Sequence, residues 1–434
     1  MEIPMDPIIK ETIAAEEKRQ RENLEMIASE NYASREVLKA AGSVLMNKYA
    51  EGYPGKRYYA GNNIIDEVEK RAQELANDLF GTVHANVQPY SGSPANLAVS
   101  LTLAKPGETI MGQALSAGGH LTHGADASLT GKLFHSVGYG VGEDGKINLE
   151  EVASLAKKYK PKMIWVGTTA YPYLLNYELF AEIADQVGAF LVADISHIAG
   201  LIAGGEHPNP AQYVDLITST THKSLRGPRG AMILTTKKGL EKDSELAAKI
   251  DKTVFPGLQG GPHLNTITAI AVALHEASQP QFREYAQQIV RNAKALAGEL
   301  DSYTENHLIL KDLSDYGFGL GYQLQIALEM AGIITNRNTV PNDKASATYP
   351  SGIRLGTPAL TSRGMKEEEM IKIAGWIQKV LEEIKGFDLP KDLHQRKFFI
   401  DDCRQKMQSN VALQEIKKEV TAFAVQYPVP GLSD

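Results

Sequence analysis

The chain has 434 residues, of which 43% are hydrophobic and 22% are charged, so it is long enough for two domains with substantial cores. Its formal net charge of -7, without a long basic run, argues against nucleic-acid binding. Cys403 is the only cysteine, which excludes an intrachain disulfide, and neither a signal-peptide pattern nor a membrane-spanning apolar run occurs. We therefore expect a cytoplasmic protein.

The first two thirds of the chain alternate between strand and helix patterns. A polar N-terminal helix is expected over residues 7–26, and an amphipathic helix over 64–80, which Asn62 or Asn63 can cap and Gly81 can end. Apolar runs then predict strands at 85–88, 109–111, 163–167, 189–194, 214–219 and 231–236, with helices at 94–104, 149–159 and 177–187. This alternation predicts a mostly parallel α/β sheet with helices on both faces.

The pattern changes after about residue 265. Two long helices are predicted over residues 263–277 and 279–300, and a shorter mixed α/β region follows. We therefore expect an N-terminal arm over residues 1–45, a large domain over 46–265 and a smaller C-terminal α/β domain over 266–434.

Two charged residues directly follow predicted strands. Asp194 ends one apolar run, and Lys223 follows the run that begins at Val214. Ligands bind beyond the carboxyl ends of strands in such sheets. An amine that forms a Schiff base, with a carboxylate that keeps a ring nitrogen protonated, is what pyridoxal phosphate (PLP) requires. The nearby cations Arg226 and Arg229 should lower the pKa of the lysine and favour its neutral form.

A small-residue segment lies between a predicted strand and a predicted helix. Ser91, Gly92 and Ser93 precede Pro94, which suits the first position of a helix. Helix N-terminal amides and two hydroxyls predict an anion site suited to the PLP phosphate. A capped helix start with nothing bound is the alternative.

Histidines occur near the same segments. His120 and His123 are three residues apart, but no cysteine, acidic partner or third histidine nearby completes a zinc set, so no metal site is predicted. We expect the ring of His120 to stack on the pyridine ring instead. His197 is expected either to orient Asp194 or the cofactor, or to be a structural histidine.

Two further features indicate an amino-acid substrate. Arg354 can bind an α-carboxylate through two hydrogen bonds, although a surface salt bridge is the alternative. Glu51, Tyr53, Tyr58 and Tyr59 lie in a loop with two glycines and a proline. Glu51 is a candidate acid or base, and the tyrosines are candidates for contacts with a ligand or a second subunit, with a structural role as the alternative.

Together these motifs resemble the serine hydroxymethyltransferases, which are fold-type I PLP-dependent enzymes. The resemblance covers about residues 10–380 and is carried by segments 24–31, 49–59, 85–88, 118–124, 220–230, 254–262 and 351–357. It implies a fold-type I transferase that converts serine and a reduced pterin carrier to glycine and the methylene carrier, in one-carbon metabolism. Tetrahydrofolate is the expected carrier, and methanopterin remains open.

The resemblance also implies a role for each matching residue. Lys223 would be the Schiff-base lysine, Asp194 the partner of the ring nitrogen and His120 the stacked ring. The remaining cofactor contacts would be Ser91, Gly92, Ser93, Thr169, His197 and His222, with Tyr49, Gly260 and Gly261 reaching the phosphate in the neighbouring subunit of a homodimer. Ser29 and Arg354 would hold the substrate carboxylate, Glu51 and Tyr59 would act at the serine hydroxyl, and Tyr58, Leu115, Gly119, Leu121 and Asn338 would contact the carrier.

Some positions depart from the family pattern. Thr169 replaces a usual serine, Ala60 a common glycine and Ala117 a larger polar residue, and residues 301–349 diverge most. Two other functions are compatible with the motifs. One is a carrier-independent PLP aldolase that cleaves threonine-like β-hydroxy amino acids. The other is a binding paralogue without a cofactor, against which the intact Lys223 and Asp194 argue.

Overall fold

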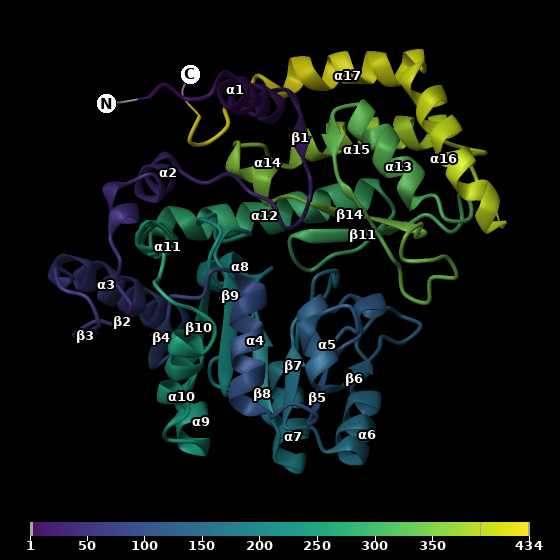
Figure 1. Ribbon diagram of the computed structural model, residues 1–434. Helices are drawn as coiled ribbons and strands as arrows, with labels where there is room; N and C mark the ends of the chain where they lie inside the picture. Colours follow the sequence, from purple (N-terminus) through teal and green to yellow (C-terminus); the bar gives the residue numbers. More distant parts are fainter. Residues whose placement is uncertain (1–2, 391, 433–434) are drawn as a thin grey trace. The chain divides into compact units, whose positions relative to one another are not determined.

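The computed structural model describes residues 3–390 and 392–432, which form two compact units (Figure 1). One unit comprises Ala33–Val290, and the other comprises Met1–Tyr32 with Arg291–Asp434. The boundary falls within helix α12 (Pro280–Glu299). Within these described residues, no helix combines the length and hydropathy that a membrane span requires. The finer division into an arm, a large domain and a small domain stays a prediction.

A seven-stranded sheet forms the centre of the unit Ala33–Val290, with the strand order β4-β10-β9-β8-β7-β5-β6. Its strands are β4 (His84–Asn86), β5 (Thr109–Gln113), β6 (His135–Tyr139), β7 (Met163–Val166), β8 (Phe190–Asp194), β9 (Leu216–Thr220) and β10 (Ala231–Thr235). Strands β5 to β9 pair in parallel, and β10 is antiparallel to both β9 and β4. The predicted mostly parallel α/β sheet is confirmed.

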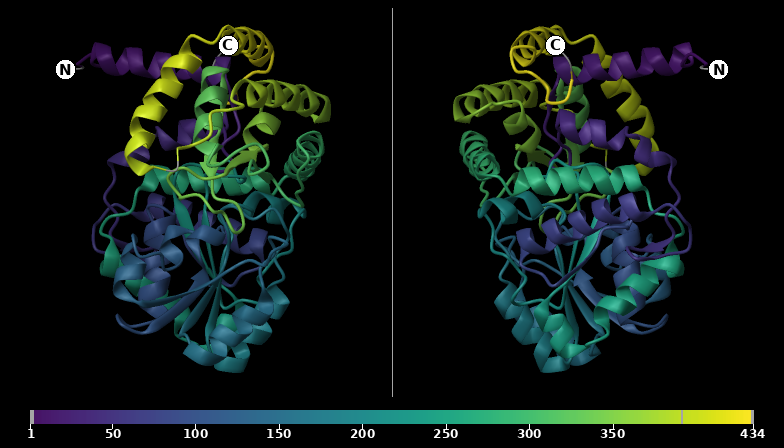
Figure 2. Two further views of the ribbon diagram at one scale, coloured as in Figure 1. Left: turned by 90° about the vertical axis from the view of Figure 1, so that its right-hand side faces the viewer. Right: turned by 90° about the vertical axis from the view of Figure 1, so that its left-hand side faces the viewer.

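Alternating side chains of this sheet enter two separate cores, because successive side chains of a strand point to opposite faces. In β7, Met163 and Trp165 join one apolar cluster, while Ile164 and Val166 join the other. Helix α4 (Gly92–Leu103) packs on the first face. The helices whose residues enter the second core are α3 (Asn63–Phe80), α6 (Leu149–Tyr159), α7 (Tyr177–Val187), α8 (Ala199–Gly204), α11 (Leu264–Ala277) and the first part of α12. Figure 2 shows helices on both sides of these strands.

The topology brings distant segments to one edge of the sheet. Because β10 is antiparallel to both of its neighbours, β4 runs in the same direction as β9. The carboxyl ends of β4, β5, β7, β8 and β9 therefore share one edge, where the segments carrying Ser91, His120, Thr169, Asp194 and Lys223 follow them. Ligand sites of open α/β sheets form at such an edge.

Shorter elements complete this unit. Two-residue strands β2 (Gly52–Tyr53) and β3 (Lys56–Arg57) form a hairpin. The helices are α2 (Arg35–Ala41), α5 (Leu129–Leu133), α9 (Lys237–Lys242) and α10 (Leu246–Lys252), with 3-10 turns at Val44–Asn47, Leu115–Ala117 and Leu121–His123, and a π-helical turn at Thr253–Leu258.

The other unit contains a three-stranded antiparallel sheet of β11 (Leu308–Asp312), β14 (Gly352–Gly356) and β13 (Asn336–Asn338), with β14 in the centre. A second small sheet pairs β1 (Leu24–Glu25) in parallel with β12 (Ile333–Ile334). The helices are α1 (Pro7–Glu22), α13 (Gly321–Met330), α14 (Pro358–Ser362), α15 (Glu367–Glu383), α16 (Leu393–Gln408) and α17 (Val411–Ala424). Leu24, Met26 and residues of α13, α14, α15, α16 and α17 share one apolar core.

Two sequence predictions about local structure are wrong, and one strand was missed. The N-terminal helix ends at Glu22 rather than residue 26, because Leu24 and Met26 are buried in a core that β1 reaches in extended form. Helix α4 begins at Gly92, so Pro94 is its third residue and not its first. Strand β6 was not predicted, because its alternating pattern includes the polar His135 and Ser136. The predicted end of α3 is confirmed, with Gly81 in the left-handed conformation at φ 71°.

Candidate active site

The turn after β8 and the loop after β9 are hydrogen-bonded to each other. The amide of Thr220 donates to Ser196 Oγ at 3.0 Å, and Ser224 Oγ donates to the carbonyl of His197 at 2.8 Å. All four residues are buried, and three of them carry hydroxyl side chains. Since Ser224 directly follows Lys223, these bonds fix the backbone of the predicted Schiff-base lysine beside the end of β8.

Asp194 ends β8 as a buried carboxylate that accepts three hydrogen bonds. Its Oδ2 accepts from Asn96 Nδ2 at 2.8 Å and from His123 Nε2 at 3.0 Å, and its Oδ1 accepts from the amide of Ser196 at 3.0 Å. Burial acts to raise the pKa of Asp194, but the His123 hydrogen bond and the surrounding cationic groups hold this pKa far below its ordinary value. The carboxylate is therefore ionised at neutral pH, as the partner of a protonated ring nitrogen must be.

His120 follows β5, which is separated from β8 by β7, and its ring is held in the neutral form. Its Nδ1 accepts from the amide of Thr122 at 3.2 Å and lies 2.7 Å from Thr122 Oγ1. Because an amide can only donate, the neutral ring carries its proton on Nε2. Burial lowers the pKa of His120 to about 4, with Asp194 opposing this shift and Lys223 adding to it. A flat, uncharged imidazole suits stacking on a cofactor ring.

The other end of the candidate site contains buried polar atoms that lack partners. Thr220 Oγ1 and His222 Nδ1 are buried without a hydrogen-bond partner among the described residues. Burial, together with the charges of Lys223 and Arg229, lowers the pKa of His222 to about 3. Such unsatisfied groups in a native protein call for a ligand. Both can donate or accept hydrogen bonds, so they fit the phosphate of PLP.

The start of α4 supplies the opposing wall. Ser91 occupies the N-cap position without a side-chain hydrogen bond to the helix. A Cβ atom on Gly92 would lie 2.7 Å from Thr220 Cγ2, so only glycine lets α4 begin this close to β9. Ser93 is exposed. The helix N-terminus and the unsatisfied groups of the lysine loop are thus adjacent, and this arrangement fits an anion.

A second group of predicted residues comes together around the β2–β3 hairpin. A Cβ atom on Gly261 would lie 2.9 Å from the ring of Tyr49, and one on Gly260 would lie 3.2 Å from Glu51 Oε1. The rings of Tyr49 and Tyr59 are 5.1 Å apart. A hollow of about 560 Å³ is lined by Glu51, Tyr58, Phe255, Pro256, Gly257, Leu258, Gln259 and Gly260.

The predicted carrier residues Leu115 and Leu121 are exposed apolar side chains on two 3-10 turns, with 47% and 45% of their surface accessible. Gly119 lies between these turns, and a Cβ atom there would be 1.9 Å from the carbonyl oxygen of Gln113. Thr169 Oγ1 donates to the Gly119 carbonyl at 3.1 Å. The hydroxyl that replaces the usual serine therefore holds the segment that leads into His120.

The unit that contains β14 carries the predicted carboxylate-binding residues. Arg354 lies in β14, and its Nε donates to Asn336 Oδ1 at 3.1 Å. Burial lowers the pKa of Arg354 to about 10, so its guanidinium stays charged at neutral pH. A Cβ atom on Gly356 would lie 2.4 Å from the Cα of Ala28, so the segment with Ser29 packs against the end of the same strand.

Asn338 lies on the neighbouring strand β13, opposite Gly352. Its side-chain amide donates to the carbonyl of Thr339 at 2.8 Å. Arg354, Ser29 and Asn338 thus belong to one compact unit.

Known proteins that match this chain agree with one another. Residues 3–377 match the family model described as serine hydroxymethyltransferase. Proteins named serine hydroxymethyltransferase from Acidothermus cellulolyticus and Sorangium cellulosum are 50% and 54% identical, over 98% and 99% of this chain and 96% of each relative. The protein of that name from Desulfotalea psychrophila is 48% identical over 98% of this chain and 95% of its own length.

The chain belongs to the serine hydroxymethyltransferase family.

The family that the sequence motifs predicted is therefore confirmed, together with the fold-type I α/β class and the hydroxymethyltransferase assignment. The role of each residue within this serine hydroxymethyltransferase fold is a separate question. Those roles stay predictions.

Sequence reasoning missed two side-chain partners of Asp194, which are Asn96 and His123. Asn96 Nδ2 bridges Asp194 Oδ2 and Thr122 Oγ1, which is 2.9 Å away, and His123 stacks on Trp165 with ring centroids 4.9 Å apart. One signal was available, because Asn96 has an amide side chain among the apolar residues of 95–99. A buried polar side chain of this kind needs a partner.

The prediction that His120 and His123 have no acidic partner is wrong. The sequence offered no acidic partner near His120 and His123, but β8 brings Asp194 to them, so that potential ligand atoms of the three residues lie within 4.8 Å of one another. The hydrogen bond between His123 and Asp194 already joins two of these atoms. We retain the cofactor interpretation for this group.

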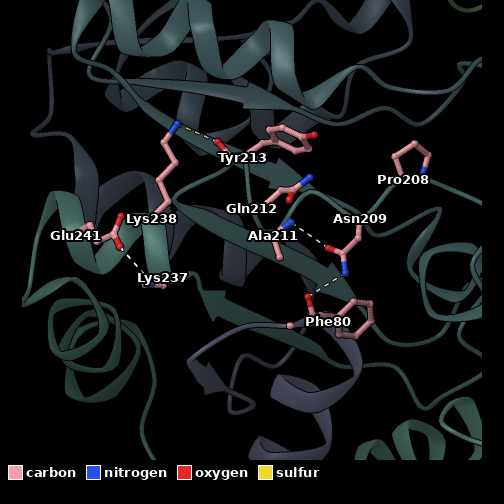
Figure 3. A pocket seen from close by; sticks show the side chains of 10 residues that line it. Phe80, Pro208, Asn209, Ala211, Gln212, Tyr213, Lys237, Lys238 and Glu241 are labelled. Carbon is pink, nitrogen blue, oxygen red and sulfur yellow. Dashed lines mark hydrogen bonds and ion pairs between the residues drawn. The ribbon is translucent and has the colours of Figure 1, made fainter.

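A larger hollow of about 800 Å³ lies at the opposite edge of the sheet, before β9 and after β10 (Figure 3). It is lined by Phe80, Gly81, Pro208, Asn209, Ala211, Gln212, Tyr213, Lys237, Lys238 and Glu241. Lys238 is paired with Asp185 at 2.9 Å and Lys237 with Glu241 at 3.8 Å. None of the residues predicted for the serine hydroxymethyltransferase site lines it.

Proposed function

We propose that this chain transfers the hydroxymethyl carbon of serine to tetrahydrofolate, giving glycine, with PLP held covalently by Lys223 Nζ. The observation that carries this proposal is the ionised, buried Asp194 next to the lysine loop, in a member of the serine hydroxymethyltransferase family. No finding supports methanopterin, which is not part of the proposal. The cytoplasmic location expected from the sequence stays a prediction.

Residues of the sheet edge are proposed to bind and tune the cofactor. When bound, PLP supplies a ring that accepts electrons from the amino-acid α-carbon. Asp194 would keep a proton on the ring nitrogen, and neutral His120 would lie against the ring. The hydrogen-bonding groups of Thr220 and His222 support phosphate binding, together with the start of α4 at Ser91, Gly92 and Ser93. His197 and Thr169 would hold the two loops in place through the bonds described above.

The remaining residues are proposed to handle the two substrates. Arg354 and Ser29 would bind the serine carboxylate, which selects the bond of the α-carbon that breaks. Glu51 would take the proton from the serine hydroxyl, with Tyr59 beside it. Tyr58, Leu115, Gly119, Leu121 and Asn338 would contact tetrahydrofolate.

We also propose a homodimer. The support is a group of apolar and aromatic side chains around the hairpin loop that are exposed in a single chain: Val44 at 80%, Met46 at 62%, Tyr49 at 54%, Tyr58 at 76% and Ile64 at 70%. Exposed apolar groups gathered in this way mark interaction sites. In the dimer, Tyr49, Gly260 and Gly261 would reach the phosphate bound by the partner subunit.

The test starts from the covalent link. Borohydride reduction of the PLP-loaded protein should attach the cofactor to Lys223, which peptide mass spectrometry can locate. Lys223→Ala should prevent attachment, whereas Lys162→Ala, an exposed lysine on the same unit, should not. Serine conversion to glycine should depend on added tetrahydrofolate. Labelling at another residue would overturn the lysine assignment, and a rate that tetrahydrofolate leaves unchanged would favour a carrier-independent aldolase.

A further inference from the structure

The backbone on both sides of Glu51 is held by one buried side chain. Arg57 Nη1 donates to the carbonyl oxygens of Ala50 at 2.9 Å and of Gly52 at 2.7 Å. The carbonyl of Glu51 itself accepts from the amide of Tyr58 at 3.0 Å. Three consecutive carbonyls are therefore fixed, with Glu51 in the middle.

Two carboxylates of α3 fix Arg57 in turn. Its Nε lies 2.9 Å from Asp66 Oδ1, and its Nη2 lies 2.5 Å from Glu69 Oε2. The side chains of Arg57 and Glu69 are 4% and 0% exposed. Gln88 Nε2 completes the cluster, because it donates to Glu69 Oε1 at 2.7 Å and to the carbonyl of Gly52 at 3.0 Å. Helix α3 and the segment after β4 thus both hold the hairpin loop.

A lysine could not replace this arginine. The guanidinium is a rigid fork whose separate nitrogens serve two carboxylates and two carbonyls at once, whereas an ammonium is a single point with three donors. A buried ion pair also adds little to net stability compared with apolar side chains of similar size. The cluster is therefore better explained by the geometry that it imposes than by the stability that it adds.

The side chain of Glu51 needs such support. In the part of the chain that the structure describes, its carboxylate lies next to Gly260 and has no hydrogen-bond partner. Gly52 is at φ +95°, and a Cβ atom there would lie 2.3 Å from the carbonyl of Lys56, so the hairpin closes tightly just after Glu51. The position of the carboxylate thus depends on the backbone that carries it.

We propose that Arg57, anchored by Glu69 and Gln88, is a positioning residue for Glu51. This inference rests on the proposed function, in which Glu51 moves the proton of the serine hydroxyl. The guanidinium does not touch the substrate; it sets the place from which Glu51 reaches it. If the Glu51 carboxylate is misplaced by about 1 Å, the reaction can slow about 100-fold, even though the mutation lies away from the reacting atoms.

The first variant is Arg57→Lys in the PLP-loaded enzyme, which keeps the positive charge between Asp66 and Glu69. We expect kcat for serine with tetrahydrofolate to fall about 100-fold, while the KM for serine changes less than about threefold. The absorption spectrum of bound PLP should be unchanged, because the cofactor residues are untouched. The matched control is Arg71→Lys, an exposed arginine of the same helix whose partner Glu74 lies at 3.1 Å.

A double-mutant cycle separates positioning from a general structural effect. If Arg57 acts through Glu51, then Arg57→Lys should slow Glu51→Gln by less than about twofold, because the group to be positioned is already inactive. Independent effects would instead multiply, and that result would overturn the inference.

A further variant covers the case in which Arg57→Lys does not fold. Gln88→Met removes one donor to the Gly52 carbonyl but leaves the ion pairs, and it should show the same lack of additivity with Glu51→Gln. Full activity of Glu51→Gln would overturn both the role of Glu51 and this inference, yet borohydride labelling of Lys223 would still support the PLP enzyme.

Discussion

Asp194 and Glu51 are both carboxylates of the same compact unit, but the protein holds them in different ways. Asp194 is buried, and its own oxygens accept hydrogen bonds from Asn96 and His123. Glu51 is half-buried, and the bonds that hold it go to backbone carbonyls through Arg57. One site fixes the functional group, and the other fixes only the chain that carries it.

The difference follows from what each carboxylate is proposed to do. A group that must stay ionised gains from hydrogen bonds to its charged form, because these bonds lower its pKa. A group that must take up and release a proton would lose that ability if the same bonds held it. Backbone anchoring fixes its place without fixing its charge.

The largest expected effect concerns the group that must stay charged. Asp194→Asn should lower kcat/KM for serine about 1,000-fold, because a neutral amide cannot stabilise a protonated ring nitrogen. The control is Asp215→Asn, since Asp215 is equally buried but accepts a hydrogen bond from the amide of Leu191 at the opposite end of β8. That variant should lose stability and keep the spectrum of bound PLP. If Asp194→Asn and the wild type gave the same PLP absorption spectrum, the proposed role of Asp194 at the ring nitrogen would be contradicted.

A second prediction concerns the anchor of the Glu51 loop. Glu69→Gln leaves the buried Arg57 charge with one carboxylate fewer, so the free energy of unfolding should fall by about 3 to 5 kcal/mol. Urea denaturation would measure it. Glu74→Gln, which removes the exposed partner of Arg71, should cost less than about 1 kcal/mol. If Glu69→Gln and Glu74→Gln lowered the free energy of unfolding by similar amounts, the buried ion pair would be no more important for stability than the exposed one.

The third prediction uses pH to probe His222, in the loop after β9. His222 has a pKa of about 3 in the folded protein, whereas an unfolded histidine has a pKa of about 6.5. Between these values the unfolded chain binds more protons, so stability is complete above about pH 6.5 and falls as the pH decreases toward 3. His222→Asn should recover up to about 3 kcal/mol of the stability lost at pH 4.5.

The smallest expected effect has opposite signs in the apo and PLP-loaded protein. Thr220→Val removes a buried hydroxyl that lacks a partner, so it should stabilise the apo protein by about 1 kcal/mol. The same change should weaken PLP binding about tenfold, because a hydrogen bond to the phosphate is lost. Thr235→Val removes a similar hydroxyl from β10 and should leave PLP affinity unchanged. Tighter PLP binding by Thr220→Val would contradict the phosphate assignment.

The sequence predicted most of the fold because its strands are buried on both faces and stand out as apolar runs. It predicted the candidate site where a functional residue directly follows such a run, as Asp194 and Lys223 do. It could not predict the partners of Asp194, because Asn96 and His123 approach it from other segments. Arg57 escaped notice for a related reason, since nothing in a tyrosine-rich loop indicates that its arginine is 4% exposed.

The pairing of β4 with β10 has a consequence for how the enzyme is made. Asn86 lies opposite Ile233, so the wall formed by Ser91 and Gly92 meets Thr220 only after a long stretch of chain has been synthesised. A nascent polypeptide that stops short of β10 already contains Ser91, Gly92, Thr220 and His222, but it lacks the strand that pairs with both β4 and β9. If PLP binds as proposed, its phosphate site would form only after β10 has been synthesised.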